Sequence, residues 1–267
     1  MDKVIGIIAG KGGVGKSTFA VNLALLLTKR GKKVGVIDAD IHGPSIQKML
    51  CEETPPRVEK GKIIPAKGLG ISYVSAAFFH SHAAGAVVRA PVANQMIGQF
   101  LELVSWPQLD YLLVDFPPGT GDIQITLLQH TLLTGAVAVT TPQEVALLDV
   151  RKSIHMIRGL HLPLLGIVEN MSYFMTDSKQ RCNVFGSGGG RRLAEEFQAP
   201  LLGQIPLDPL IAQCSDRGVS FFATSTASCS AFEEIADGLE RELTLQQKRE
   251  AGCLDAFELI WDPDKRE

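Results

Sequence analysis

The sequence predicts an α/β fold in which helices cover both faces of one doubly wound, mostly parallel sheet. Two observations lead to this prediction. Short β-branched runs alternate with longer helical patterns, and the short runs are apolar on successive residues. Continuous apolar runs are typical of strands that are buried on both faces of a parallel sheet. The alternation of strand and helix then corresponds to repeated βαβ units within a single sheet.

The expected elements follow the chain from its start. The runs predicted to form strands are KVIGII, KKVGVI, YLLVD, AVAVTT, LLGIVEN and LLGQIP. The segment STFAVNLALLLTKR is expected to form a helix that ends at Gly31, because glycine commonly follows the last helical turn. The proline-containing stretch from Glu52 to Gly68 indicates a loop or a small hairpin. Past Phe232 we expect a charged helical segment, so residues 1–250 are assigned to one domain and residues 251–267 to a C-terminal tail.

Composition narrows the class of protein. The chain has 267 residues, 45% of them hydrophobic, which is enough to bury a large single core. Its formal charge of -3 gives no basic field, so neither nucleic acid nor a membrane is expected as a partner. No uncharged apolar run approaches the roughly 18 residues of a membrane span, and no secretory signal pattern is found, so we expect a cytoplasmic protein. Its five cysteines are then expected to be reduced.

The strongest chemical signal is AGKGGVGKST, between the first predicted strand and the first predicted helix. It satisfies the phosphate-loop pattern G-x-x-x-x-G-K-S and predicts a phosphate-loop NTPase fold that binds ATP with Mg²⁺. Backbone N–H groups and the helix N-terminus would surround the phosphates. Lys16 would neutralise the β and γ phosphates, and the Ser17 hydroxyl would coordinate Mg²⁺. The residues expected to contact the nucleotide here are Gly10, Lys11, Gly12, Gly13, Val14, Gly15, Lys16, Ser17 and Thr18.

Three carboxylates are expected to follow strands. Asp38 and Asp40 leave the second strand in VIDADIHGPSI, and Asp115 ends the third in YLLVDFPPGTGD. Ligands of open parallel sheets bind at the carboxyl ends of the strands, so all three should converge beside the phosphate loop. Asp115 is the natural carboxylate of the Mg²⁺ shell, and Asp38 is expected to be a second, outer-shell group. Asp40 is the candidate that orients the attacking water.

Lys11 is an additional cation that the minimal motif does not require. A lysine at this place resembles the deviant phosphate-loop ATPases, in which it reaches across a dimer to the partner's nucleotide. Charge builds on the bridging and γ oxygens during phosphoryl transfer, so a cation supplied by a second subunit would make hydrolysis depend on dimerisation. We therefore expect slow, Mg-dependent hydrolysis of ATP with Lys11, Lys16 and Asp40 as catalytic residues.

A longer resemblance extends from Lys3 to Val219. The chain resembles the Mrp-type ATPases, the scaffold and carrier proteins of iron–sulfur cluster assembly, in AGKGGVGKST, DADIHGPSI, LDYLLVDFPPGTGDIQITLLQ, VTTPQEVALLDVRKSIHMIRG, LLGIVENMSYF, VFGSGGG and GQIPLDPLI. The segments PPGTGD and VENMSYF are much narrower signals than the phosphate loop. The resemblance implies a homodimeric ATPase that holds a bridging iron–sulfur cluster and passes it to apoproteins. It also implies that Asn170 reads the adenine, with the segment from Pro206 to Asp208 against the base.

The sequence departs from this family at its metal motif. After NMSYF and one further residue the family has C-P-x-C, but Met175 is followed here by TDSK, so both expected thiolates are missing. A cluster shared across a two-fold axis needs about four ligands, two from each chain. Cys182 is the nearby cysteine that could supply one. Cys214, Cys51, Cys229 and Cys253 cannot be assigned from the sequence, and the glycine run GSGGG is either an anion-binding nest or the entry to the helix GRRLAEEFQ.

Three functions are compatible with these observations. The first is an ATP-hydrolysing carrier of iron–sulfur clusters, which the length of the resemblance favours. The second is an ATPase switch or adaptor that keeps the nucleotide site and has lost the cluster. The third is a positioning ATPase of the Min or Par type. The acidic terminal helix and the PPGTGD and ENMSYF segments argue against the third.

Overall fold

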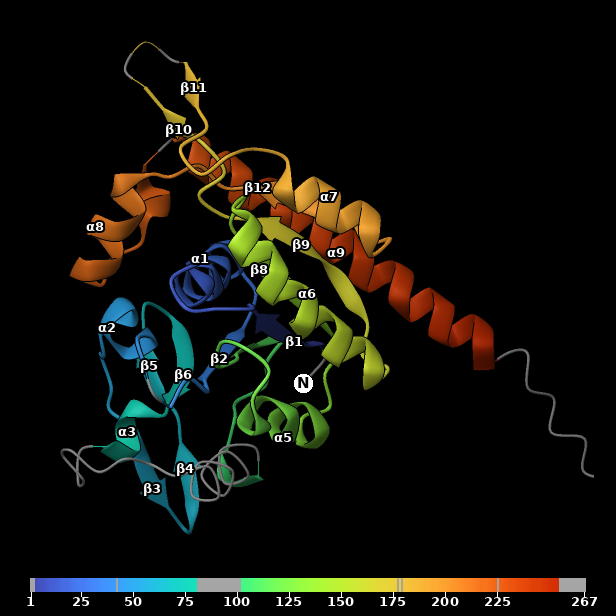
Figure 1. Cartoon of the computed structure of the whole chain (residues 1–267). Coiled ribbons are helices and arrows are strands. Elements are labelled where there is room, and N and C mark those ends of the chain that lie inside the picture. Colours follow the sequence, from blue (N-terminus) through green and yellow to red (C-terminus); the bar gives the residue numbers. More distant parts are fainter. Residues whose placement is uncertain are drawn as a thin grey trace, which may run out of the picture.

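A computed structural model describes residues 3–41, 43–80, 102–176, 178, 180–224 and 226–254. Its central sheet has eight strands in the order β12-β9-β8-β1-β7-β2-β6-β5 (Figure 1). The bounds are β1 Lys3–Ile8, β2 Val34–Asp38, β5 Ala66–Gly68, β6 Ile71–Ser75, β7 Tyr111–Asp115, β8 Gly135–Thr140, β9 Leu164–Glu169 and β12 Leu201–Gln204. Neighbouring strands run parallel except at β5, which pairs antiparallel with β6. The α/β, doubly wound, mostly parallel class is therefore confirmed.

Helices cover both faces of the sheet (Figure 1). Side chains of one face pack with α1 (Lys16–Lys29), α2 (Ile46–Leu50), α8 (Pro209–Arg217) and α9 (Ala227–Leu254). Side chains of the other face pack with α5 (Asp122–His130), α6 (Glu144–Gly159) and α7 (Gly189–Glu196). Ile7 belongs to the first cluster and Ile8 to the second, as the two-residue period of a strand requires. This is why the predicted strands are apolar on successive residues.

All six runs predicted as strands form strands of the central sheet. Strand β6 was missed because Ser72 and Ser75 interrupt its apolar pattern, although both are buried. The Glu52 to Gly68 stretch contains the expected hairpin, β3 (Arg57–Glu59) and β4 (Lys62–Ile64), and it also contributes β5. The short helix α3 (Ala77–His80) follows β6, and the short 3₁₀ helix η1 (Phe221–Ala223) precedes α9.

The first and last helices follow the sequence-based expectations. Helix α1 ends at Lys29, and Gly31 follows with a φ of 79°, in the left-handed region that favours glycine. Helix α9 packs against β12 through buried side chains that include Phe232, Ile235 and Leu239. It runs past residue 250, so the division into residues 1–250 and a tail stays a prediction, and residues 255–267 lie outside the described ranges.

A two-stranded hairpin projects from the end of the sheet (Figure 1). Its strands are β10 (Phe174–Met175) and β11 (Arg181–Cys182). The GSGGG run then leads directly into α7, so its simpler interpretation as a helix entry is confirmed.

Candidate functional site

The phosphate loop joins β1 to α1, as predicted. Gly13 and Gly15 have φ values of 82° and 83°, which L side chains rarely adopt. Gly10 is required for a different reason: a Cβ there would lie 2.1 Å from backbone atoms of Asp149 and Val150, so the loop packs directly against α6. The motif therefore encodes both a left-handed turn and a close backbone contact.

Lys16, Ser17 and Asp115 form a tight polar group at the end of the loop. Lys16 Nζ donates to Asp115 Oδ1 at 2.6 Å, and Ser17 Oγ donates to Asp115 Oδ2 at 2.6 Å. Strand pairing brings them together, because Asp115 is aligned with Ile7, near the end of β1. Burial raises the pKa of Asp115, and the ammonium of Lys16 opposes this rise. In this structure Lys16 is thus held by a carboxylate at the place where the motif predicts phosphate binding.

Asp38 lies next to Asp115 and is fully buried. Burial, followed by the charge of Asp115, raises the pKa of Asp38 to about 7. Its Oδ2 accepts from Ser75 Oγ at 2.9 Å and from the backbone N–H groups of Ser45 and Ile46. Asp38 therefore organises the loop that leaves β2 and the start of α2.

Asp40 is half-buried and belongs to the same carboxylate group. Its Oδ1 accepts from the Gly43 N–H at 3.1 Å, and its charge contributes to the raised pKa of Asp115. The structure thus brings Asp38, Asp40 and Asp115 together as strand-end geometry predicts. Lys11 is half-buried, and its side chain makes no hydrogen bond or ion pair with the described residues. The individual roles assigned to these residues stay predictions.

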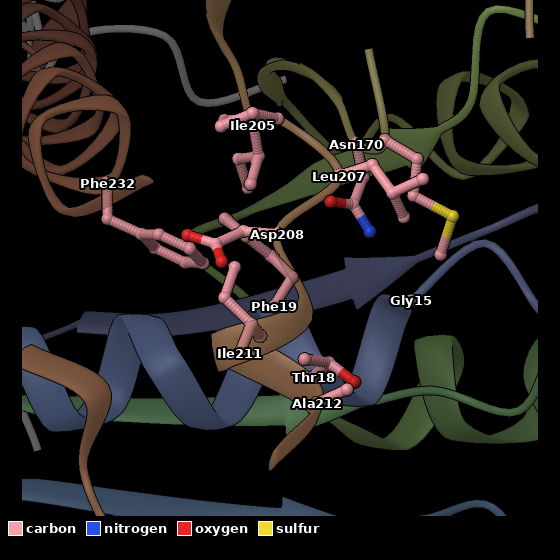
Figure 2. Close-up of a pocket in the computed structure, with 12 residues that line it drawn as sticks. Gly15, Thr18, Phe19, Asn170, Ile205, Leu207, Asp208, Ile211, Ala212 and Phe232 are labelled. Atoms are coloured by element: carbon pink, nitrogen blue, oxygen red, sulfur yellow. The ribbon is translucent and has the colours of Figure 1, made fainter. Parts of the chain in front are cut away.

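A pocket of about 140 Å³ opens beside the phosphate loop (Figure 2). Its walls come from the loop and α1, the end of β9, the segment after β12, and helices α8 and α9. The lining residues are Gly15, Thr18, Phe19, Asn170, Met171, Ile205, Pro206, Leu207, Asp208, Ile211, Ala212 and Phe232. The polar and apolar lining suits a nucleobase, which presents hydrogen-bonding edges and flat faces.

Asn170 connects this pocket to the phosphate loop. Its Nδ2 donates to the Val14 carbonyl at 2.8 Å, and a Cβ at Gly15 would lie 2.2 Å from the same nitrogen. A side-chain amide has a second N–H and an oxygen acceptor with which to contact an adenine edge. Asn170 and the Pro206 to Asp208 segment thus line one pocket, as expected. The aromatic walls Phe19 and Phe232 were not predicted, because they come from helices at opposite ends of the chain.

Cys182 is exposed on the projecting hairpin, where it pairs with Phe174. Cys51 is also exposed. Cys214 and Cys229 are half-buried, pack against the core and are unsuited to binding a surface cluster. Within the described ranges, no three His, Cys, Asp or Glu side chains are placed so that all three could hold one metal ion, and this includes the neighbouring carboxylates of Asp38, Asp40 and Asp115. The structure therefore leaves Cys182 accessible but gives it no second thiolate from the described part of its own chain.

Comparison with known proteins identifies the family. A ParA family model, described as the NUBPL iron-transfer P-loop NTPase, matches residues 1–240. The chain belongs to this NTPase family. An iron–sulfur cluster carrier protein of Salmonella typhimurium is 43% identical over 91% of this chain and 67% of its own length. One of Methanocaldococcus jannaschii is 45% identical over 86% of this chain and 81% of its own length. The chain spans only 65% of a similar carrier from Deinococcus radiodurans.

Solved structures agree with the NTPase fold. An Archaeoglobus fulgidus nucleotide-binding protein in complex with ADP is 39% identical, with a TM-score of 0.71 over 81% of this chain and 86% of that one. The cell division ATPase MinD of Pyrococcus furiosus has a TM-score of 0.67 over 90% of this chain and 99% of its own, at 22% identity. The second likeness shows the fold alone.

In the part of the chain that the structure describes, every helix is too short or too polar to cross a bilayer.

Proposed function

We propose that this NTPase is an ATP-hydrolysing carrier that binds iron–sulfur clusters and transfers them to apoproteins. The observation that supports this most directly is the match to named cluster carriers over 85–91% of the chain. The described nucleotide site and the accessible thiol on a projecting hairpin are consistent with it. Four described cysteines are free, which suits a reducing compartment such as the cytoplasm.

The nucleotide site provides the groups that hydrolysis of ATP requires. Asn170 would contact the adenine, and the loop amides would bind the phosphates. Lys16 would move from Asp115 to the β and γ phosphates and neutralise the charge that develops as the bond from the γ phosphorus to the bridging oxygen breaks. Asp40 would orient the water that attacks the γ phosphorus.

The oxygen atoms of Ser17 and Asp115 fit Mg²⁺. Both are hard donors, and they lie 2.6 Å apart at the end of the phosphate loop. Asp38, which is buried beside Asp115, would support them from an outer shell. When bound, the ion would neutralise phosphate charge.

The proposed carrier acts as a homodimer, in which Lys11 of each subunit would reach the nucleotide of the other and the two Cys182 thiolates would share one cluster. Lys11 has no partner among the described residues, which suits a cation that reaches the nucleotide of a second subunit. Mixing Lys11→Ala protein with Lys16→Ala protein should restore part of the hydrolysis in heterodimers. Heterodimers that form without any rescue would contradict the assignment in trans.

The cargo site is one thiolate per chain, Cys182. Two chains would then supply two thiolates, and the remaining ligands of a cluster would have to come from small molecules or from the recipient. The missing cysteine pair favours a second candidate, an ATPase switch or adaptor that has lost cluster binding. A Min- or Par-type positioning function has the support of fold likeness alone.

The proposed function is tested by hydrolysis and transfer assays on the same preparation. Wild-type protein reconstituted anaerobically with iron and sulfide should hydrolyse Mg-ATP slowly and activate an iron–sulfur apoprotein, whereas Lys16→Ala should not hydrolyse ATP. Normal turnover by Lys16→Ala would refute the assigned site. Hydrolysis without bound iron or transfer would favour the switch.

A further inference from the structure

The Cys182 hairpin belongs to an excursion of the chain between β9 and α7, which extends from Ser172 to Gly190. Both ends of this excursion are hydrogen-bonded to one carboxylate, that of Glu169 at the end of β9. Ser172 Oγ donates to Glu169 Oε1 at 2.5 Å, and the Gly190 N–H donates to Glu169 Oε2 at 2.5 Å. One side chain therefore closes the base of the whole excursion.

The environment of Glu169 is built for a buried carboxylate. The residue has no exposed surface, and a third donor, Gln204 Nε2 from β12, lies 2.7 Å from its Oε1. A buried carboxylate is tolerated when several donors satisfy its oxygens. Gly190 lies in the first turn of α7, where a negative charge is favourable. A Cβ at Gly190 would lie 2.8 Å from Glu169 Cβ, so glycine is what allows this approach.

The same position is linked to the nucleotide pocket. The residue after Glu169 is Asn170, which lines the pocket and contacts the phosphate loop. The backbone joins the two regions again, because the Ser172 N–H donates to the Ile205 carbonyl at 2.9 Å and the Leu207 N–H donates to the Tyr173 carbonyl at 2.7 Å. Ile205 and Leu207 line the nucleotide pocket as well. The wall of the pocket and the root of the hairpin are thus one hydrogen-bonded unit.

We propose that Glu169 is a positioning residue that holds both ends of the Ser172 to Gly190 excursion and transmits the seating of the nucleotide to the Cys182 hairpin. The biological role of this coupling rests on the proposed carrier function, since the hairpin carries the Cys182 thiol. The coupling itself is a property of the nucleotide site and the hairpin, and it is measurable without any cluster.

Hydrogen exchange of the excursion, measured by mass spectrometry with and without Mg-ADP, tests the proposal. In wild type, the nucleotide should slow exchange of amides in the excursion about fivefold, the effect of one stabilised hydrogen bond. Glu169→Gln keeps the shape of the side chain but replaces one acceptor oxygen with an NH₂ group. This NH₂ group would face a group that is itself a donor, so one of the hydrogen bonds at the base of the excursion is lost. This variant should lose the nucleotide-dependent change while its affinity for ADP, measured by calorimetry, stays within about threefold of wild type.

A merely structural role gives a different result. Glu169→Gln would then speed exchange equally with and without ADP, and the fivefold ratio would persist. That outcome overturns the proposal, as does a wild-type excursion that does not respond to Mg-ADP.

Gln204→Met is the matched control: it removes a donor to the same carboxylate, together with a 3.1 Å contact to Ser172 Oγ, but leaves the hydrogen bonds of Ser172 and Gly190 to Glu169 in place. It should keep the response, and loss of the response in this control as well would contradict the specific role of the two ends. If Glu169→Gln does not fold, Gly190→Ala serves instead, since its Cβ displaces the helix terminus from the carboxylate, and it should lose the response. Failure of cluster reconstitution would contradict the carrier function and leave this result unchanged.

Discussion

Asp115→Asn removes the charge of one partner in a buried ion pair and keeps the shape of its side chain. Lys16 is 6% exposed and Asp115 is 0% exposed, with 2.6 Å between Lys16 Nζ and Asp115 Oδ1. Removing one partner of such a pair leaves the other charge buried without its direct partner. We expect the unfolding free energy of the nucleotide-free protein to fall by about 3 kcal/mol, the lower end of the range for buried pairs, because Lys16 is at the edge of the loop.

A chain of this size loses about 2 °C in melting temperature for each kcal/mol, so the expected shift is about 6 °C. Adding ADP without Mg²⁺ should restore most of the lost melting temperature, because the ADP phosphates provide Lys16 with a new anionic partner. The stabilisation by ADP is then larger in Asp115→Asn than in wild type. Thermal unfolding by calorimetry in the presence of EDTA, with and without ADP, measures both effects.

Asp149→Asn is the matched control. It makes the same chemical change in an ion pair with Lys152, but the two side chains are 32% and 69% exposed. Such a pair contributes about 1 kcal/mol or less, so its melting temperature should change by no more than about 2 °C. Equal shifts in the two variants, or equal stabilisation of wild type and Asp115→Asn by ADP, would refute the reasoning.

Three further predictions concern the nucleotide site. Asn170→Ala should weaken ATP binding about tenfold and reduce discrimination against GTP in calorimetric titrations, because the contact with the Val14 carbonyl and an amide facing the base are both lost; unchanged selectivity would contradict the adenine assignment. Gly10→Ala should destabilise the protein by at least about 2 kcal/mol, since its Cβ meets the α6 backbone, whereas Gly12→Ala, with nothing within 4 Å of its Cβ, should be tolerated in the same denaturation assay. Chelation of Mg²⁺ should stop phosphate release from ATP but leave ADP binding, because Lys16 and the loop amides still hold the phosphates; continued release would contradict the role of Ser17 and Asp115.

Much of the fold is predictable because strands buried on both faces need apolar residues on both. Strand β6 shows the limit of this reasoning. Ser75 is fully buried, and it is satisfied there by donating to Asp38, a contact that no local pattern contains. Strand β5 has three residues, Ala66–Gly68, and it forms by pairing with β6 at the edge of the sheet.

The phosphate loop and the strand-end carboxylates are predictable because local spacing and parallel-sheet geometry place them. The pocket walls Phe19 and Phe232 could not be predicted in this way. Their ring centroids lie 5.8 Å apart only because α1 and α9 pack together. The hydrogen bonds to Glu169 could not be predicted from the sequence for the same reason, because their donors come from three separate segments. In the sequence, Glu169 is simply the last residue of a strand.

The proposed function holds that this NTPase carries a cluster on Cys182, although its sequence lacks the cysteine pair that the resemblance to the Mrp-type ATPases implies. Iron quantification and visible absorption after anaerobic reconstitution test it most directly, on wild type, Cys182→Ser and Cys51→Ser. Cys51 is the control because it is also an exposed free thiol and lies outside the hairpin. The account predicts a bound cluster in wild type and Cys51→Ser and its loss in Cys182→Ser. Wild-type protein without iron, or full iron content in Cys182→Ser, would contradict it.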